Sequence, residues 1–112
     1  PAALGHHPLD LLGSIVDQSQ ANADRLLGNQ VPETRALCRL ARDLGATAAS
    51  AFGAGFGGAV WALLPAQGAD LFLQQWGELY RQAFPAAASR STFLLTRPGP
   101  PAFRIVGKPS RR

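Results

Sequence analysis

The chain has 112 residues, the size of one ordinary domain, and 46% of them are hydrophobic. Its formal net charge of +4 is unevenly placed: residues 90–112 carry six basic groups and no acid, whereas residues 1–89 carry five basic and seven acidic groups. The basic end lacks aromatic residues near Lys108, the single cysteine excludes an internal disulfide, and no apolar stretch is long enough to span a bilayer. We therefore expect a cytoplasmic protein whose partners include neither nucleic acid nor a membrane.

The first half of the chain predicts two helices. Apolar and small residues recur at steps of three and four and share one helix face: Leu9, Leu12, Val16, Ser19, Ala23 and Leu26. The sequence Gly28-Asn29-Gln30 interrupts this pattern, and Pro32 and Glu33 suit the first turn of a second helix. Its core face is expected to contain Leu37, Leu40, Ala41 and Leu44, with Gly45 as its stop. Cys38 lies beside that face, so we interpret it as a small core residue and not as a nucleophile.

A glycine-rich hairpin follows the second helix. Residues 46–52 and 59–64 read as strands, and the loop between them has four glycines in six residues: Gly53, Ala54, Gly55, Phe56, Gly57 and Gly58. The letters GxGxxG occur here, but a dinucleotide site needs a helix after the glycines, and none is predicted. Residues without a Cβ let a backbone approach a phosphate closely, whereas the alternative is a glycine-rich turn that binds nothing.

The rest of the chain predicts a third helix and two more strands. An apolar and aromatic stripe runs from Ala69 to Phe84 and ends at Pro85, and its Trp76 is expected in the core. Residues 91–96 and 102–106 read as strands joined by a rigid turn at 98–101. The order ααββαββ predicts an α+β fold, with a largely antiparallel sheet, helices packed on one face and a ferredoxin-like second half. We assign residues 1–106 to one domain and expect 107–112 to be a disordered basic tail.

The spacing of several anchor residues resembles the C-terminal part of the galactokinase branch of the GHMP sugar and metabolite kinases. That branch has a helix reading LGxLMxxSHxSL, a YxVSxPELD segment, a second helix, and a strand running into GGGFGG. The resemblance covers about residues 9–64 and is carried by Leu12-Gly13, Ser19, Pro32-Glu33, Gly45 and the loop Gly53–Gly58. Departures include Gln20 where the branch has His and Ala54 for the middle glycine.

The resemblance implies the C-terminal domain of an ATP-dependent sugar 1-kinase that uses Mg²⁺, with galactose as the leading substrate. Its phosphate loop of the PxxxGLSSSA type and its catalytic Asp would lie in an N-terminal domain, which is the implied partner. We expect this chain to contribute loop closure, with Phe56 packed under the loop, and to hold no catalytic residue and no metal site. It begins at Pro1 and has no methionine, so we expect a piece of a longer protein.

Two other functions fit the same residues. One is a non-catalytic binding or regulatory domain that keeps the fold without the kinase activity. The other is a GHMP kinase acting on mevalonate, homoserine or another sugar. An upstream PxxxGLSSSA segment would favour an enzyme over a binding domain.

Overall fold

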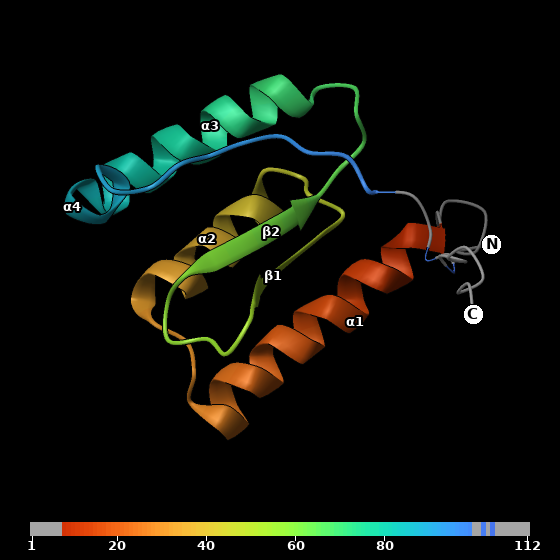
Figure 1. The fold of residues 1–112 in the computed structure, drawn as a ribbon, viewed down its shortest axis with the longest axis horizontal. Coiled ribbons are helices and arrows are strands. Elements are labelled where there is room, and N and C mark those ends of the chain that lie inside the picture. Colours follow the sequence, from red (N-terminus) through yellow and green to blue (C-terminus); the bar gives the residue numbers. More distant parts are fainter. Residues whose placement is uncertain (1–7, 100–101, 103, 105–112) are drawn as a thin grey trace, which may run out of the picture.

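The computed structural model describes residues 8–99, 102 and 104. The elements are α1 (Pro8–Asn22), the π-helical turn η2 (Ala23–Leu27), α2 (Pro32–Asp43), β1 (Ala48–Phe52), β2 (Ala59–Leu63), α3 (Ala69–Ala83) and α4 (Pro85–Ala88). Figure 1 shows the hairpin in the middle, with α1 on one side of it and α3 on the other. The two helices, the hairpin and the third helix predicted from the sequence are therefore confirmed.

Glycine and proline set the element boundaries as their backbone preferences require. Gly28 is left-handed, with φ of 61°, and its N–H donates to Asp24 O at 3.2 Å, which ends η2. Pro32 lies in the first turn of α2, where a missing N–H costs nothing. Gly45, with φ of 100°, follows the end of that helix. Pro85 ends α3 as predicted and also begins the four-residue helix α4.

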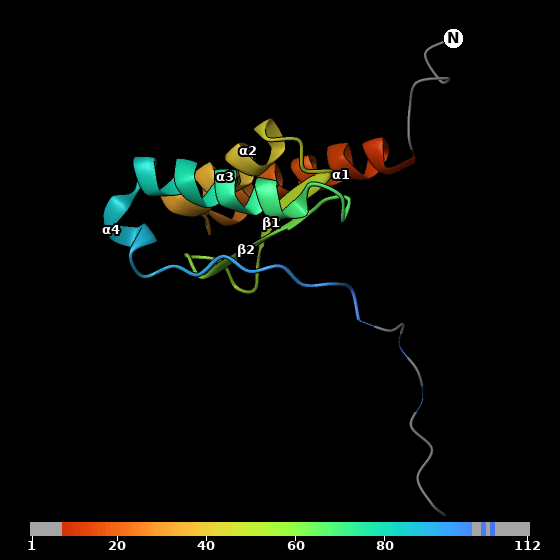
Figure 2. The same ribbon diagram turned by 90° about the horizontal axis from the view of Figure 1, so that it is seen from above.

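The sheet is a single antiparallel pair in which Ala48 faces Leu63 and Phe52 faces Ala59. In Figure 2 the helices lie above the hairpin, while the segment after α4 runs at the level of β2. The core between these layers is built from small residues and two aromatic rings: Ala41, Ala46, Ala49, Phe72 and Trp76. Trp76 donates from its indole N–H to Leu37 O at 2.9 Å, so the polar edge of this buried ring has a partner. The small residues let α2 approach the strands closely.

Cys38 is buried on α2, as predicted for a small core residue, with 6% of its surface exposed. Burial away from water raises the pKa of its thiol to about 11. A thiol with this pKa is almost entirely protonated at neutral pH, which fits a packing role.

The prediction of a strand at residues 91–96 is wrong. These residues are extended but belong to no strand, so the described sheet has two strands, and it is not the larger ferredoxin-like sheet that was expected. The ring of Phe93 lies edge-on to Trp76, with centroids 5.2 Å apart, and also contacts Tyr80. The contacts of Phe93 with two aromatic rings of α3 hold this extended segment alongside that helix (Figure 1).

Two further expectations fall mainly outside the described residues. They are the strand at 102–106, of which Ala102 and Arg104 are described and are not in a strand, and the basic tail at 107–112. In the part of the chain that is described, none of the helices combines the length and apolar character that a membrane span requires.

The buried face of α1 differs from the predicted one by a small rotation. Leu12, Val16 and Ala23 are partly buried as expected, but Ser19 is exposed and Gln20 is turned inward in its place. Leu26 lies in the π-helical turn and is 67% exposed. The stripe therefore contains one polar side chain that the apolar pattern did not include.

Candidate functional site

The glycine loop joins β1 to β2 and has an unusual backbone. Gly53, Gly55, Gly57 and Gly58 have φ values of 84°, 90°, 107° and 97°, and Phe56 has φ of 61°. Side chains with a Cβ rarely adopt these values, so the four glycines meet a conformational requirement of the turn. The predicted hairpin and its glycine requirement are thus explained by backbone geometry, before any ligand is considered.

A close approach involves one of these glycines, and the approaching group belongs to the chain itself. A Cβ on Gly55 would lie 2.5 Å from Asn29 O and 2.7 Å from Asn29 Cβ. A Cβ on Gly53, Gly57 or Gly58 would meet open space. Gly55 therefore accommodates the link between η2 and α2, whereas the other three glycines border space that a ligand can occupy.

Asn29 makes two hydrogen bonds to the loop. Its side-chain Nδ2 donates to Ala54 O at 3.2 Å, and its backbone carbonyl accepts a hydrogen bond from Phe56 N–H. These hydrogen bonds lie on either side of Gly55, so the three successive loop residues 54–56 all contact Asn29. The sequence analysis treated Asn29 as a helix break, and it had no way to place it against a loop about 25 residues further on.

The expected role of Phe56 is wrong for this chain. The ring is 71% exposed, so it does not pack under the loop. A bulky residue with positive φ is an outlier whose cost, of order 1–3 kcal/mol, is usually offset elsewhere in a structure. Here the hydrogen bond from Phe56 N–H to Asn29 O fixes that backbone and leaves the ring directed away from the core.

Three side-chain amides form a chain of hydrogen bonds that reaches the loop. The backbone N–H of Ala51 donates to Gln20 Oε1 at 3.1 Å, and Gln20 Nε2 donates to Gln30 Oε1 at 2.8 Å. Gln30 Nε2 then donates to Asn29 Oδ1 at 3.1 Å, which leaves Asn29 Nδ2 for Ala54 O. We call Gln20, Gln30 and Asn29 the amide chain.

A buried hydroxyl braces the middle of the amide chain. Thr34 is 3% exposed and donates to Gln30 Oε1 at 2.9 Å, while it accepts from Val31 N–H at 3.1 Å. Gln30 is itself buried, with 8% of its surface exposed. A buried amide is tolerated where its donors and acceptors are matched, which is the case here. Gln20 was detectable in the sequence, since it follows Val16 by four residues and so adjoins the apolar stripe.

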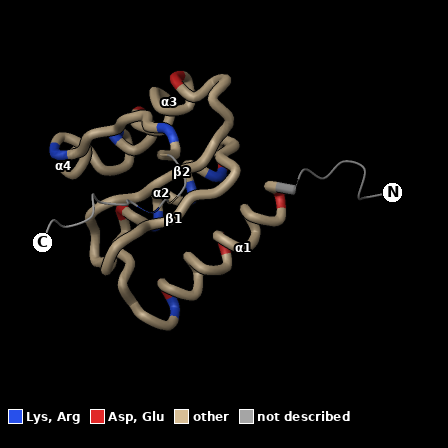
Figure 3. The backbone as a smooth tube through the Cα atoms, turned by 45° about the vertical axis from the view of Figure 1, so that its right-hand side comes forward, with Lys and Arg blue, Asp and Glu red and all other residues tan. Residues whose placement is uncertain are grey.

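The loop presents amide N–H groups in a setting free of charge. Among the residues that the structure describes, a hydrogen bond engages the N–H of Phe56, residues 53 and 54 form a turn, and the N–H groups of Gly53, Gly57 and Gly58 have no hydrogen-bond acceptor. No charged residue occurs between Asp43 and Asp70 in the sequence, and both strands and the loop are tan throughout in Figure 3. Backbone N–H groups with no carboxylate beside them are suited to bind the oxygens of a phosphate.

An ion pair joins η2 to α2 next to the link that carries Asn29 and Gln30. Arg35 on α2 donates to both carboxylate oxygens of Asp24, at 2.8 and 2.9 Å, and its pKa is raised by this contact. The same hydrogen bond to Arg35 lowers the pKa of Asp24. Arg35 also reaches the backbone carbonyl of Gln30 at 3.4 Å, so the pair supports the link that carries the amide chain.

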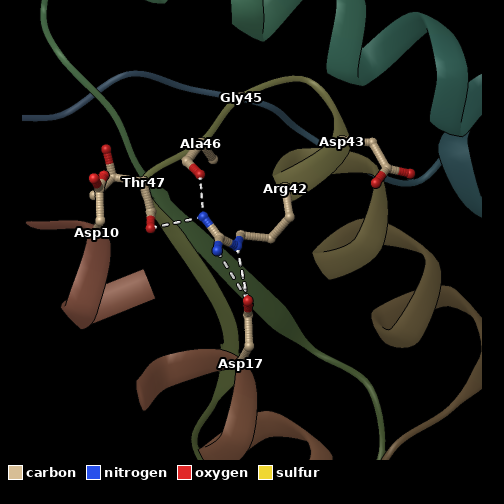
Figure 4. Close-up of a pocket in the computed structure, with 7 residues that line it drawn as sticks. All are labelled: Asp10, Asp17, Arg42, Asp43, Gly45, Ala46 and Thr47. Atoms are coloured by element: carbon tan, nitrogen blue, oxygen red, sulfur yellow. Dashed lines mark hydrogen bonds and ion pairs between the residues drawn. The ribbon is translucent and has the colours of Figure 1, made fainter. Parts of the chain in front are cut away.

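A hollow of about 440 Å³ lies at the opposite end of β1 and is lined by Asp10, Asp17, Arg42, Asp43, Gly45, Ala46 and Thr47. Figure 4 shows the guanidinium of Arg42 pointing to Asp17 and to two backbone carbonyls. Its bonds measure 2.9 Å to each Asp17 oxygen, 2.7 Å to Ala46 O and 2.9 Å to Thr47 O. These charges are used to join α1, α2 and β1, which is a structural function.

Within the described ranges 8–99, 102 and 104, the structure contains no group of three or more His, Cys, Asp or Glu side chains that could hold a metal ion. Among the acids of the hollow, Asp17 pairs with Arg42 near the start of β1, whereas the glycine loop follows the end of that strand. A strand of this length separates the two by roughly 15 Å at about 3.3 Å per residue. The loop itself contains glycine, alanine and phenylalanine, so its polar groups are backbone N–H and carbonyl groups.

The comparison with known proteins identifies the class. The family model described as GHMP kinases C terminal matches residues 2–82, which is more than half of the chain. The chain therefore belongs to the GHMP kinase family and carries its C-terminal domain. No curated protein and no solved structure matches it significantly. The matched range includes the glycine loop and the whole amide chain, and the predicted family is confirmed.

Proposed function

We propose that the protein carrying this chain is an ATP-dependent kinase that phosphorylates the anomeric hydroxyl of a sugar, and that the glycine loop closes its active-site cleft. The family match supports a kinase, and the resemblance over residues 9–64 to the galactokinase branch supports a sugar, with galactose first. The observation that carries the role of the loop is that the N–H groups of Gly53, Gly57 and Gly58 have no acceptor in the described structure and that these three glycines border open space.

The loop acts by electrostatic stabilisation at short range. A transferred phosphoryl group spreads negative charge over its oxygens, and backbone N–H groups fixed in advance stabilise that charge without reorganising. The missing Cβ atoms at Gly53, Gly57 and Gly58 allow phosphate oxygens to come within hydrogen-bond distance of the backbone. An uncharged hairpin around the loop avoids repulsion of the same oxygens.

ATP supplies the phosphoryl group, and Mg²⁺ neutralises charge on its phosphates when bound. The described residues fit the phosphate part of this ligand through the loop, and they offer no carboxylate group for the metal. We assign the metal ligands and the residue that orients the sugar hydroxyl to the N-terminal domain. The isolated chain should therefore show no kinase activity.

The surface near the loop supports an N-terminal domain as partner. Two large apolar side chains at the end of β1 and in the loop are exposed by more than half, Phe52 at 55% and Phe56 at 71%, and so are Leu26 at 67% and Leu27 at 70% in the turn that precedes Asn29. Exposed apolar side chains of this size are typical of a surface that another domain covers. We propose that Phe56, held outward by its own backbone, inserts into that partner.

The loop is tested in the full-length protein by two matched substitutions, Gly53→Ala and Gly68→Ala. Both glycines have nearly the same φ, 84° and 82°, and a Cβ on either would meet open space. The cost in unfolding free energy should thus be similar, on the order of 1–2 kcal/mol. Gly68 is the N-cap of α3 and follows the end of β2, whereas the loop precedes the start of β2. We expect Gly53→Ala to lower kcat/KM for ATP by at least about tenfold beyond the effect of Gly68→Ala.

Equal kinetics in the two variants would show that the loop is a turn that binds nothing. The acceptor is tested with the wild-type protein by measuring ADP release with galactose, other sugars, mevalonate and homoserine. Turnover with mevalonate or homoserine, and with none of the sugars, would show that the acceptor is not a sugar. Absence of turnover with every acceptor, together with absence of ATP binding, would favour a non-catalytic domain.

A further inference from the structure

We propose that the amide chain of Gln20, Gln30 and Asn29 is the device that positions the glycine loop for phosphate contact, with Asn29 as the residue that acts on the loop. This role in turnover rests on the proposed kinase function. The geometric part stands on the hydrogen bonds alone. None of these side chains belongs to the loop, and each comes from α1 or from the link between η2 and α2.

The direction of the hydrogen bonds is the first support. Each amide accepts at its oxygen from the preceding member and donates from its nitrogen to the next, starting at Ala51 N–H and ending at Ala54 O. Bonds aligned head to tail polarise one another and strengthen the series. The series also spans the junction between β1 and the loop, because it connects the backbone N–H of Ala51 with the backbone carbonyl of Ala54. The end of the strand and the beginning of the loop are thereby held in one fixed relation.

The second support is that each amide oxygen and each amide nitrogen of the series has a hydrogen-bond partner. Gln30 Oε1 accepts from Gln20 and from Thr34, and its nitrogen donates to Asn29. In the described part of the chain every buried side-chain nitrogen and oxygen has a partner. A half-satisfied buried network would cost more than an apolar core, so removal of one member should disturb the others.

The third support is which loop atoms the amide chain engages. Asn29 holds the carbonyl of Ala54 and the N–H of Phe56, and its atoms fill the space where a Cβ of Gly55 would lie. The inner side of the loop, which is the side formed by residues 54–56, is therefore occupied by Asn29. The N–H groups of Gly53, Gly57 and Gly58 have no acceptor in the described structure, and these residues border open space. An asparagine that fixes the inner side thus determines where the outer N–H groups point.

The experiment compares two pairs of variants in the full-length protein. Asn29→Ala removes the end of the amide chain, and Asn22→Ala removes a half-buried asparagine that bonds to Gln18 and Arg25 and not to the amide chain. Gln20→Met removes the start of the amide chain, and Gln18→Met changes the same residue type on the outer face of α1. The two readouts are hydrogen exchange at the Phe56 amide and kcat with saturating ATP, both measured well below the melting temperature.

We expect Asn29→Ala and Gln20→Met each to speed exchange at Phe56 by about fivefold, the equivalent of one net hydrogen bond, while the control variants change it little. The kcat should fall by a similar factor in the same two variants. Combining Asn29→Ala with Gln20→Met should add little to either single effect, since the two side chains do not touch and act through Gln30. A purely structural role at two separate sites would give additive effects.

Exchange at Phe56 that matches the control variants would overturn the proposal, and so would faster exchange with an unchanged kcat. Additive effects in the double variant would also overturn it, because they would show two independent sites. If the wild-type protein phosphorylates no acceptor, the proposed kinase function fails. In that event the exchange data and their additivity decide by themselves whether the amide chain holds the loop.

Discussion

The two ends of β1 are held by opposite kinds of chemistry. At the start of the strand the guanidinium of Arg42 joins α2 to two other segments. It donates hydrogen bonds to Asp17 on α1 and to the carbonyls of Ala46 and Thr47, which precede β1. At the end of the strand, uncharged amides connect α1, the following link and the glycine loop. The charged end is suited to fixing the fold, because a planar fork of donors joins several segments at once. At the uncharged end the strands and the loop contribute no charged side chain, since none occurs between Asp43 and Asp70.

The same contrast appears in the glycines that allow each contact. Gly13 on α1 lies against the carbonyl of Thr47 and the guanidinium of Arg42, so it serves the charged end. Gly55 lies against Asn29 and serves the uncharged end. Both glycines are required by packing within the chain. The difference between the ends predicts that changes at the start alter stability, whereas changes at the end alter turnover.

The largest effect is expected from Gly13→Ala. A Cβ there would lie 2.9 Å from Arg42 Nη2 and closer still to the backbone oxygen of Thr47, which cannot swing away. We expect a loss of unfolding free energy of about 2 kcal/mol from this overpacking, after the gain in helix propensity is subtracted. Urea unfolding measures it. Turnover of the full-length protein at low temperature should stay near that of the wild type.

Gly77→Ala is the matched control for Gly13→Ala. It also lies within a helix and is buried, but its nearest neighbour would be a ring carbon of Phe93 at 3.7 Å, an ordinary contact. Here the helix propensity of Ala should raise the unfolding free energy by about 0.5–1 kcal/mol. Opposite signs in the two variants are therefore expected. The same sign in both would show that the close approach of α1 to the start of β1 does not restrict the chain.

A smaller effect is expected from Arg42→Ala. The ion pair with Asp17 is partly exposed and the two carbonyl bonds are partly buried, so their joint loss should cost about 1 kcal/mol. Arg39→Ala on the same helix is the control, because Arg39 is exposed and its replacement should change unfolding free energy by less than about 0.5 kcal/mol. Equal costs for the two arginines would contradict a charged clamp at the start of β1.

The smallest effect on stability is expected from the exposed ion pair beside the uncharged end. Arg35 lowers the pKa of Asp24 below its usual 3.8, so the pair contributes to stability above that pH and loses the contribution as pH falls through the lowered pKa. NMR titration should show Asp24 protonating below 3.8 in the wild type and near 3.8 in Arg35→Gln. An unshifted Asp24 in the wild type would show that the pair is not formed in solution.

Much of the local structure could be predicted from the sequence because local chemistry decides it. Pro32 and Gly45 delimit α2, four glycines define the loop, and the aromatic stripe of α3 faces the core, as expected. The strand at 91–96 was wrong for a non-local reason. Its apolar residues fit a strand equally well, but contact between Phe93 and Trp76 decided where the segment lies.

The sequence by itself determined the hairpin, the helix boundaries and the GHMP kinase family, since these depend on residue types at fixed spacing along the chain. The tertiary structure decided that Gln20 and not Ser19 faces inward, because both positions adjoin the apolar stripe of α1 and the apolar pattern alone does not choose between them. It also decided that Asn29 fills the space beside Gly55 and that Phe56 faces outward. Contacts between residues some 25 positions apart arise when the elements pack, and a periodicity along one element carries no information about them.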